Sequence, residues 1–155
     1  MAVLGGAFED FQTAYKKLFD IIQSGLAIDK FNELILIQGG NPDFINNPAK
    51  LPQSKYKIEV KAKNTGYVNE IDAEIIGLSA MLLGAGRRTK DDFIDHAAGI
   101  TLNKKIGDKV LKGETLCVLH TNKEDNNEAI DRISEAYLVN ESIPEKEKYV
   151  YDIIE

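Results

Sequence analysis

Apolar residues recur every three or four positions between residues 8 and 22. That spacing places them along one face of a helix, and Gly25 predicts its end because glycine accepts the left-handed conformation that closes helices. A second, shorter helix is expected to begin at Asp29 as N-cap and to end at residues 39–40. The apolar members of the two predicted helices are Phe8, Phe11, Tyr15, Leu18, Phe19, Ile22, Phe31, Leu34 and Ile35.

Prolines and asparagines crowd the stretch between residues 41 and 52, and such a composition indicates a connector. We place the domain boundary there, near Ser54. Two short helices cannot bury both of their apolar faces against each other and form a stable domain. Residues 1–53 are therefore predicted to belong to a larger structure.

The pattern changes to a period of two after this boundary. Residues 57–62 alternate between apolar and charged side chains, which predicts a half-buried strand, and residues 67–71 continue as a second strand. Residues 73–83 are apolar nearly all round, so they are expected to form a buried helix capped by Asp72 and ended by the glycines of residues 84–86.

The remainder of the chain predicts several short strands and one more helix. Strands are expected around residues 93–94, 99–102 and 115–120, and two turn signals flank Val110. Residues 125–138 predict a helix that turns Ile130, Ile133 and Tyr137 inward. The tail, residues 148–155, alternates weakly and is expected to be an edge strand. The second part is thus predicted to be α+β.

Charge and cysteine content exclude several function classes. The formal net charge is -6 over 155 residues, and this anionic surface disfavours binding to nucleic acid or anionic lipid. Cys117, the one cysteine, lies in an apolar run and predicts a buried structural thiol in a reducing compartment, with no zinc spacing around it. No signal peptide or membrane-spanning run is evident, so we expect a cytoplasmic protein without cofactor or metal.

Glycines, prolines and apolar runs follow one another in a distinctive order along the chain. They comprise the runs at residues 66–78, 80–90, 94–95, 99–100 and 107–114, preceded by Phe31, residues 38–42, 47–48 and 51–52. In this order the chain resembles the C-terminal part of the pyrimidine-nucleoside and thymidine phosphorylases. The resemblance covers almost the whole sequence and is collinear with the family.

This resemblance implies a fold and partners. Residues 54–155 would form an α/β-hammerhead, barrel-like C-terminal domain with a lipoyl/biotinyl-like hairpin. The preceding helical segment, residues 1–53, would lie on the helical side of the larger α/β domain of the full enzyme. The implied partners are the N-terminal catalytic portion of that enzyme and a second subunit in a homodimer.

The resemblance also implies an activity that this chain lacks the residues to perform. The family exchanges the base of a pyrimidine nucleoside for phosphate, a pentosyl transfer that gives the sugar 1-phosphate. Its phosphate-binding lysine, histidine and Gly-Gly-x-Gly-Asp loop, and its base-binding arginine, serine and lysine, belong to the N-terminal portion. The glycine pairs at residues 5–6 and 39–40 have the wrong followers. No catalytic, substrate-binding or metal residue is carried over, and we expect an inactive C-terminal fragment.

Arg87 and Arg88, after the glycines of residues 84–86, are the candidate anion-binding residues. Phosphate loops normally precede a helix, where free N–H groups point at the anion, whereas these glycines follow one. We therefore interpret the segment as a helix end whose arginines pair with Asp91, Asp92 or Asp95. The alternative is a contact between the two arginines and the catalytic part of the complete enzyme.

Lys123 raises an alternative function. The stretch from residue 107 to residue 123 is similar to the hairpin of lipoyl and biotinyl carrier domains, and Lys123 falls near the modified lysine. A swinging arm needs this lysine at a tight hairpin tip, whereas residues 124–127 lead into a helical pattern. A third possibility is a partner protein that docks with a separately made N-terminal half. His96 and His120 have no neighbouring nucleophile, and the carboxylate pairs are interpreted as helix caps.

Overall fold

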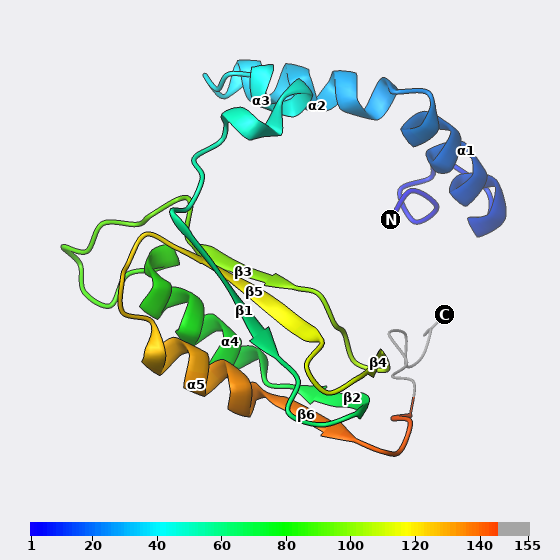
Figure 1. Cartoon of the computed structure of the whole chain (residues 1–155). Coiled ribbons are helices and arrows are strands. Elements are labelled where there is room, and N and C mark those ends of the chain that lie inside the picture. Colours follow the sequence, from blue (N-terminus) through cyan, green and yellow to red (C-terminus); the bar gives the residue numbers. More distant parts are fainter. Residues whose placement is uncertain (146–155) are drawn as a thin grey trace. The chain divides into compact units, whose positions relative to one another are not determined.

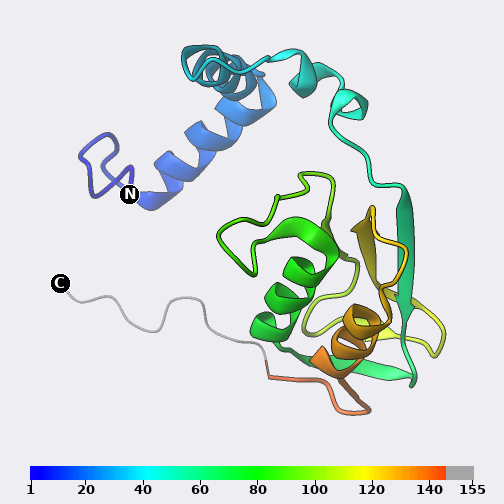
Figure 2. The same cartoon turned by 90° about the vertical axis from the view of Figure 1, so that its left-hand side faces the viewer.

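The computed structural model describes residues 1–145 and divides into two compact units. The first unit is Met1–Leu51 and the second begins at Pro52. Figures 1 and 2 show the helices and strands of both units. The edge strand expected at residues 148–155 lies outside the described residues. The assignment of residues 1–53 to a larger domain stays a prediction.

The first unit contains only helical elements. They are α1 (Phe11–Gln23), α2 (Leu26–Ile37), α3 (Asp43–Asn46) and the 3-10 turn η1 (Pro48–Lys50). The first helix begins three residues later than the apolar spacing suggested, because the Asp10 side chain accepts a hydrogen bond from the Thr13 N–H at 2.9 Å and caps it. Its end at Ser24 and Gly25 is confirmed.

The predicted start of α2 was wrong. Gly25, with φ of 85°, stands at its N-cap, and Asp29 lies within the first turn instead of capping the helix. A glycine in the left-handed conformation can end one helix and begin the next without steric cost. Only Ala14 is buried among the residues of this unit, so the two long helices share very little core.

Up to residue 145 the second unit contains two three-stranded antiparallel sheets. One has the order β1-β5-β3 and the other has the order β4-β2-β6. Their bounds are β1 (Tyr56–Lys61), β2 (Gly66–Ile71), β3 (Gly99–Leu102), β4 (Lys109–Val110), β5 (Thr115–Thr121) and β6 (Tyr137–Asn140). Within residues 52–145 the two sheets are not joined into a closed barrel.

Two helices cover one face of the β1-β5-β3 sheet. The helices α4 (Ala73–Ala80) and α5 (Asn127–Ala136) lie side by side, and both views place them on the same side of the strands (Figures 1 and 2). The predicted cap of α4 is confirmed, since Asp72 accepts from the Ile75 N–H at 2.9 Å. The core lies between helices and strands and includes Val60, Val68, Leu83, Val110, Leu116, Cys117, Leu119 and Ile133.

Two further expectations differ from the structure. No strand forms at residues 93–94, where the chain is an irregular connection. The last helix ends at Ala136, and Tyr137 begins β6 instead of continuing the helix, although it is buried as expected. Pairing of β6 with β2 is a long-range event that a local apolar period cannot reveal. The general expectation of an α+β second part is confirmed.

Candidate functional site

The connection after α4 is the first candidate site, and it starts from a glycine in a positive-φ conformation. The helix continues as the π-helical turn η2 (Met81–Ala85), in which Gly84 has φ of 115°. A Cβ atom at Gly84 would lie 3.4 Å from the Cβ of Asp95 and 3.7 Å from that of Ala98. Glycine is therefore needed here, and the expected helix end at this position is confirmed.

The segment that follows, residues 86–98, is named here the arginine loop. Its second half is fixed to the body of the unit by Asp95. The Asp95 N–H donates to the Gly84 carbonyl at 2.9 Å, and its carboxylate accepts from the Asn122 amide at 2.8 Å and from the Ala97 N–H at 2.9 Å. These bonds hold the second half of the loop against Gly84 and against Asn122, which follows β5 directly.

Asp92 organises the first half of the loop from within. Its carboxylate accepts hydrogen bonds from the hydroxyl and N–H of Thr89, at 2.7 and 3.0 Å, and from the N–H of Arg88 at 2.8 Å. The Thr89 hydroxyl is the main reason that the pKa of this carboxyl lies below its ordinary value. The carboxylate therefore stays charged and keeps the turn closed.

The two arginine side chains do not form the ion pairs expected from the sequence. Asp92 meets the backbone of Arg88, and among residues 1–145 neither guanidinium pairs with a carboxylate. Both arginines are exposed, and Phe93 on the same loop is 84% exposed. Guanidinium groups can bind a carboxylate or phosphate, and an exposed ring on the same loop can meet an apolar surface. The loop is thus equipped for contact and carries no nucleophile.

Lys123 is bonded to the end of the helix that was expected to be buried, an expectation that holds only in part, since Ser79 and Leu83 are the buried residues between residues 73 and 83. Its ammonium donates to the Leu82 carbonyl at 2.7 Å, and the Thr121 hydroxyl donates to the Leu83 carbonyl at 3.0 Å. Both carbonyls belong to the last helical turn. Carbonyls at this end of a helix have no N–H partner within the helix and carry partial negative charge. Lys123, which lies between β5 and α5, therefore caps the end of η2 with a positive charge, and α5 begins at Asn127.

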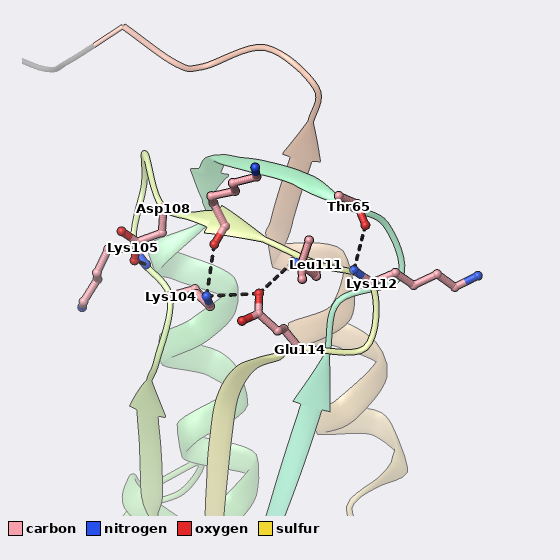
Figure 3. Close-up of polar contacts among 8 residues, drawn as sticks. Thr65, Lys104, Lys105, Asp108, Leu111, Lys112 and Glu114 are labelled. Atoms are coloured by element: carbon pink, nitrogen blue, oxygen red, sulfur yellow. Dashed lines mark hydrogen bonds and ion pairs between the residues drawn. The ribbon is translucent and has the colours of Figure 1, made fainter.

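The turns around β4 form a second polar cluster, drawn in Figure 3. The Lys104 ammonium lies 3.2 Å from the Glu114 carboxylate and 3.1 Å from the Lys109 carbonyl. Glu114 also accepts from the Leu111 N–H at 2.7 Å. The Leu111 hydrogen bond, followed by that of Lys104, lowers the pKa of the Glu114 carboxyl. The cluster ties the start of β5 to the turn before β4.

Thr65 joins this cluster to the connection between β1 and β2, since its hydroxyl accepts from the Lys112 N–H at 2.9 Å (Figure 3). Such bonds fix the turn without creating a reactive group. The Lys104–Glu114 pair escaped the sequence analysis because its members are ten residues apart in different turns. No local pattern marks a pair of that kind.

The two histidines and the cysteine are the remaining candidate residues. His120 is hydrogen-bonded to the Thr101 hydroxyl at 3.0 Å across two neighbouring strands, and His96 is exposed. Cys117 is fully buried as predicted, and burial raises the pKa of its thiol to about 11. Residues 1–145 contain no group of three or more metal-ligating side chains. No helix in this range has the length and apolar character needed to cross a membrane.

Comparison with known proteins gives the family. Residues 67–140, from β2 to the end of β6, match the pyrimidine nucleoside phosphorylase C-terminal domain. Residues 67–140 therefore represent the C-terminal domain of this family. It is 45% identical over 139 residues to the pyrimidine-nucleoside phosphorylases of Staphylococcus aureus strains USA300, NCTC 8325 / PS 47 and COL. The alignment covers 90% of this chain and 32% of each relative, so the chain spans about a third of their length.

The match with the family agrees with the resemblance found in the sequence. The matched domain contains α4, the arginine loop, the Lys104–Glu114 cluster and α5. It therefore includes each of the three site residues singled out earlier, Arg87, Arg88 and Lys123.

Proposed function

We propose that this chain is the C-terminal part of a pyrimidine-nucleoside phosphorylase and has no phosphorolytic activity alone. The full enzyme exchanges the base of a pyrimidine nucleoside for phosphate and releases the sugar 1-phosphate. The observation that carries the proposal is the 45% identity over 139 residues to relatives of which the chain spans only 32%. Similarity this high over so much of the chain favours a common role for this part.

The chemistry of the described residues supports an inactive part. Phosphorolysis needs a phosphate cradle, donors to the base and stabilisation of an oxocarbenium-like sugar. The Gly-Gly-x-Gly-Asp phosphate loop that the family resemblance implies has no counterpart in this sequence. The side chains of Asp95, Lys123 and Glu114 are hydrogen-bonded to other groups within the protein. Only Arg87 and Arg88 offer unpaired charge among the candidate residues, and they lie on a surface loop.

We assign the second unit the role of one jaw of a closing cleft that excludes water from the reacting centre. The arginine loop would be its contact with the catalytic part, because two free guanidinium groups and an exposed phenylalanine suit a surface that meets another domain. In this proposal residues 1–53 belong to the larger α/β domain, and residues 54–155 adopt an α/β-hammerhead arrangement. The complete enzyme would be a cytoplasmic homodimer.

The carrier alternative has no observation in its favour. A carrier lysine must be free at a hairpin tip, whereas the Lys123 ammonium is bonded to the Leu82 carbonyl and the chain continues into α5. An intact mass without a lipoyl or biotinyl adduct is the expected result.

The test is a phosphorolysis assay with thymidine or uridine and excess inorganic phosphate. The chain alone is expected to release no free base above the buffer blank. Co-expression with the N-terminal two-thirds of the Staphylococcus aureus relative is expected to restore base release, with the relative's own two parts as positive control. Activity of the chain alone would refute the inactive-part proposal.

A matched pair of variants tests the assigned contact. Arg87→Ala with Arg88→Ala should weaken the restored activity at least tenfold, while Lys57→Ala on the exposed face of β1 should leave it unchanged. Equal activity of the two preparations would remove the arginine loop from the contact with the catalytic part.

A further inference from the structure

A groove in the second unit is lined by the start of α4 and by the connection from β3 to β4, and we name it the α4 groove. Its volume is about 960 Å³. Its large apolar side chains are Ile71, Ile76, Leu102, Ile106 and Ile143. Sites that enclose drug-sized molecules have volumes of roughly 300–1,000 Å³, so the α4 groove has room for several side chains of a peptide segment.

The wall formed by the β3–β4 connection is held in place by hydrogen bonds. The Gly107 N–H donates to the Val68 carbonyl in β2 at 2.8 Å, and the Lys105 N–H donates to the Asp108 carboxylate at 2.7 Å. The groove is therefore already formed, although Ile106 in this wall is 44% exposed. An apolar side chain held in that way gains from a segment that covers it.

The last described residues of the chain lead into this groove. Asn69 in β2 fixes their path, since its amide donates to the Ser142 carbonyl at 3.2 Å and its side-chain oxygen accepts from the Asn140 N–H at 3.2 Å. Residues 143–145 then line the groove themselves. Any occupant of the groove must share it with the start of the segment that follows Glu145.

The sequence of that segment suits an apolar groove. Residues 149–154 read Tyr-Val-Tyr-Asp-Ile-Ile, and a period of two places Tyr149, Tyr151 and Ile153 on one face. Residues 146–155 can span on the order of 30 Å when extended, which is ample for a groove that begins at their attachment. An attached segment also has an effective concentration in the millimolar range, about the highest that a flexible connection gives. A separate domain or a second copy lacks this advantage.

The charges are complementary as well. Lys105 lies in the wall of the groove, and among residues 1–145 its ammonium forms no ion pair. Asp152 lies on the face of the segment opposite to Tyr151, where it would meet the rim of the groove and the Lys105 ammonium.

We propose that residues 149–154 bind in the α4 groove of their own chain, with Tyr149, Tyr151 and Ile153 against its apolar walls. The segment completes the packing of the second unit between α4 and the β3–β4 connection. The proposal does not depend on the phosphorylase assignment, because its tests measure contact and not activity.

Disulfide trapping in the full chain is the first test. Ile106→Cys combined with Tyr151→Cys should close an internal disulfide on mild oxidation of a dilute solution, since the natural Cys117 is fully buried. Intact mass and migration on a non-reducing gel measure the closed fraction. The matched control combines Tyr151→Cys with Lys57→Cys, an exposed position of β1 outside the groove, and its closed fraction should be roughly tenfold lower.

Hydrogen exchange distinguishes the two faces of the segment. Tyr151→Asp should raise the exchange rates of the amides of residues 105–108 by roughly tenfold, because it uncovers this wall. The matched control, Val150→Asp, changes the opposite face and should alter these rates less than about twofold. The amides of α5 check that the second unit stays folded in both variants.

A 106–151 pair that closes no more than its control overturns the proposal, and it would leave the groove to another occupant. Disulfides between chains, which would place the segment on a second copy, overturn it too. So do equal effects of the two aspartate variants on the amides of residues 105–108.

Discussion

The two units of this chain use similar apolar residues with opposite results. In the first unit the large side chains of α1 and α2 stay largely exposed, and Ala14 is the one buried residue between Met1 and Leu51. In the second unit side chains of the same kinds, such as Leu83, Leu119 and Ile133, are fully buried. The difference is not one of hydrophobicity.

What separates the units is the number of layers available for packing. The second unit has a sheet, two helices on one of its faces and a further small sheet, so apolar side chains from distant parts of the chain meet. In the first unit the two long helices make few contacts with each other. An amphipathic helix needs a second surface of matching size, and residues 1–51 do not provide it.

The sharpest test of this comparison is one substitution made in both units. Leu119→Ala, at a fully buried position in β5, should lower the free energy of unfolding by about 2–5 kcal/mol. Leu36→Ala, at a 59% exposed position in α2, should change it by less than about 0.5 kcal/mol. Urea denaturation followed by circular dichroism measures both. Equal losses of unfolding free energy in the two variants would mean that Leu36 is buried against another part of the protein.

The buried thiol should make the second unit sensitive to alkali. Burial raises the pKa of Cys117 to about 11 from an ordinary value of 9.0, and burial likewise raises the pKa of Tyr137. A raised pKa contributes stability below pH 9 that is lost as pH rises towards 11, because the unfolded thiol ionises first. For Cys117 the loss reaches about 2 kcal/mol.

Denaturation midpoints measured between pH 7 and pH 11 check this expectation. Cys117→Ala should flatten the decline over that range, although it lowers stability at pH 7 through lost packing. A slope that Cys117→Ala leaves unaltered would show that the thiol is not the titrating group.

Two glycines give the smallest expected effects, with opposite signs. Gly84→Ala should destabilise the second unit by roughly 1–2 kcal/mol, because φ of 115° is strained for a residue with a Cβ and Asp95 lies close. Gly77→Ala, in the middle of α4 with open space around it, should stabilise by about 0.5–1 kcal/mol. Thermal midpoints of the two variants should move in opposite directions from that of the natural chain.

Much of the local structure followed from the order of residues. The cap at Asp72, the turn at Gly84 and the strand from residue 115 to residue 120 were predictable because each depends on neighbours in sequence. The start of α2 and the change from helix to strand at Tyr137 were not. Gly25 served both helices at once, and β6 exists because it pairs with β2 from across the chain.

The candidate site divides in the same way. The sequence placed Arg87 and Arg88 after a helix end and placed Lys123 before a helix, and both placements are found in the structure. It could not predict that the Asp92 carboxylate would accept hydrogen bonds from backbone N–H groups of the arginine loop and leave the guanidinium groups unpaired. Which donor reaches a carboxylate depends on the path of the loop, and no spacing encodes that path.

The family, the two-part organisation of the apolar pattern and the local helix ends follow from residue identity and near neighbours. The burial of apolar faces, the pairing of charges and the positions of the Lys104, Glu114 and Lys123 side chains depend on the folded arrangement. Burial and pairing result from contacts between residues far apart in the chain. Their free energies belong to the folded arrangement and not to any segment alone.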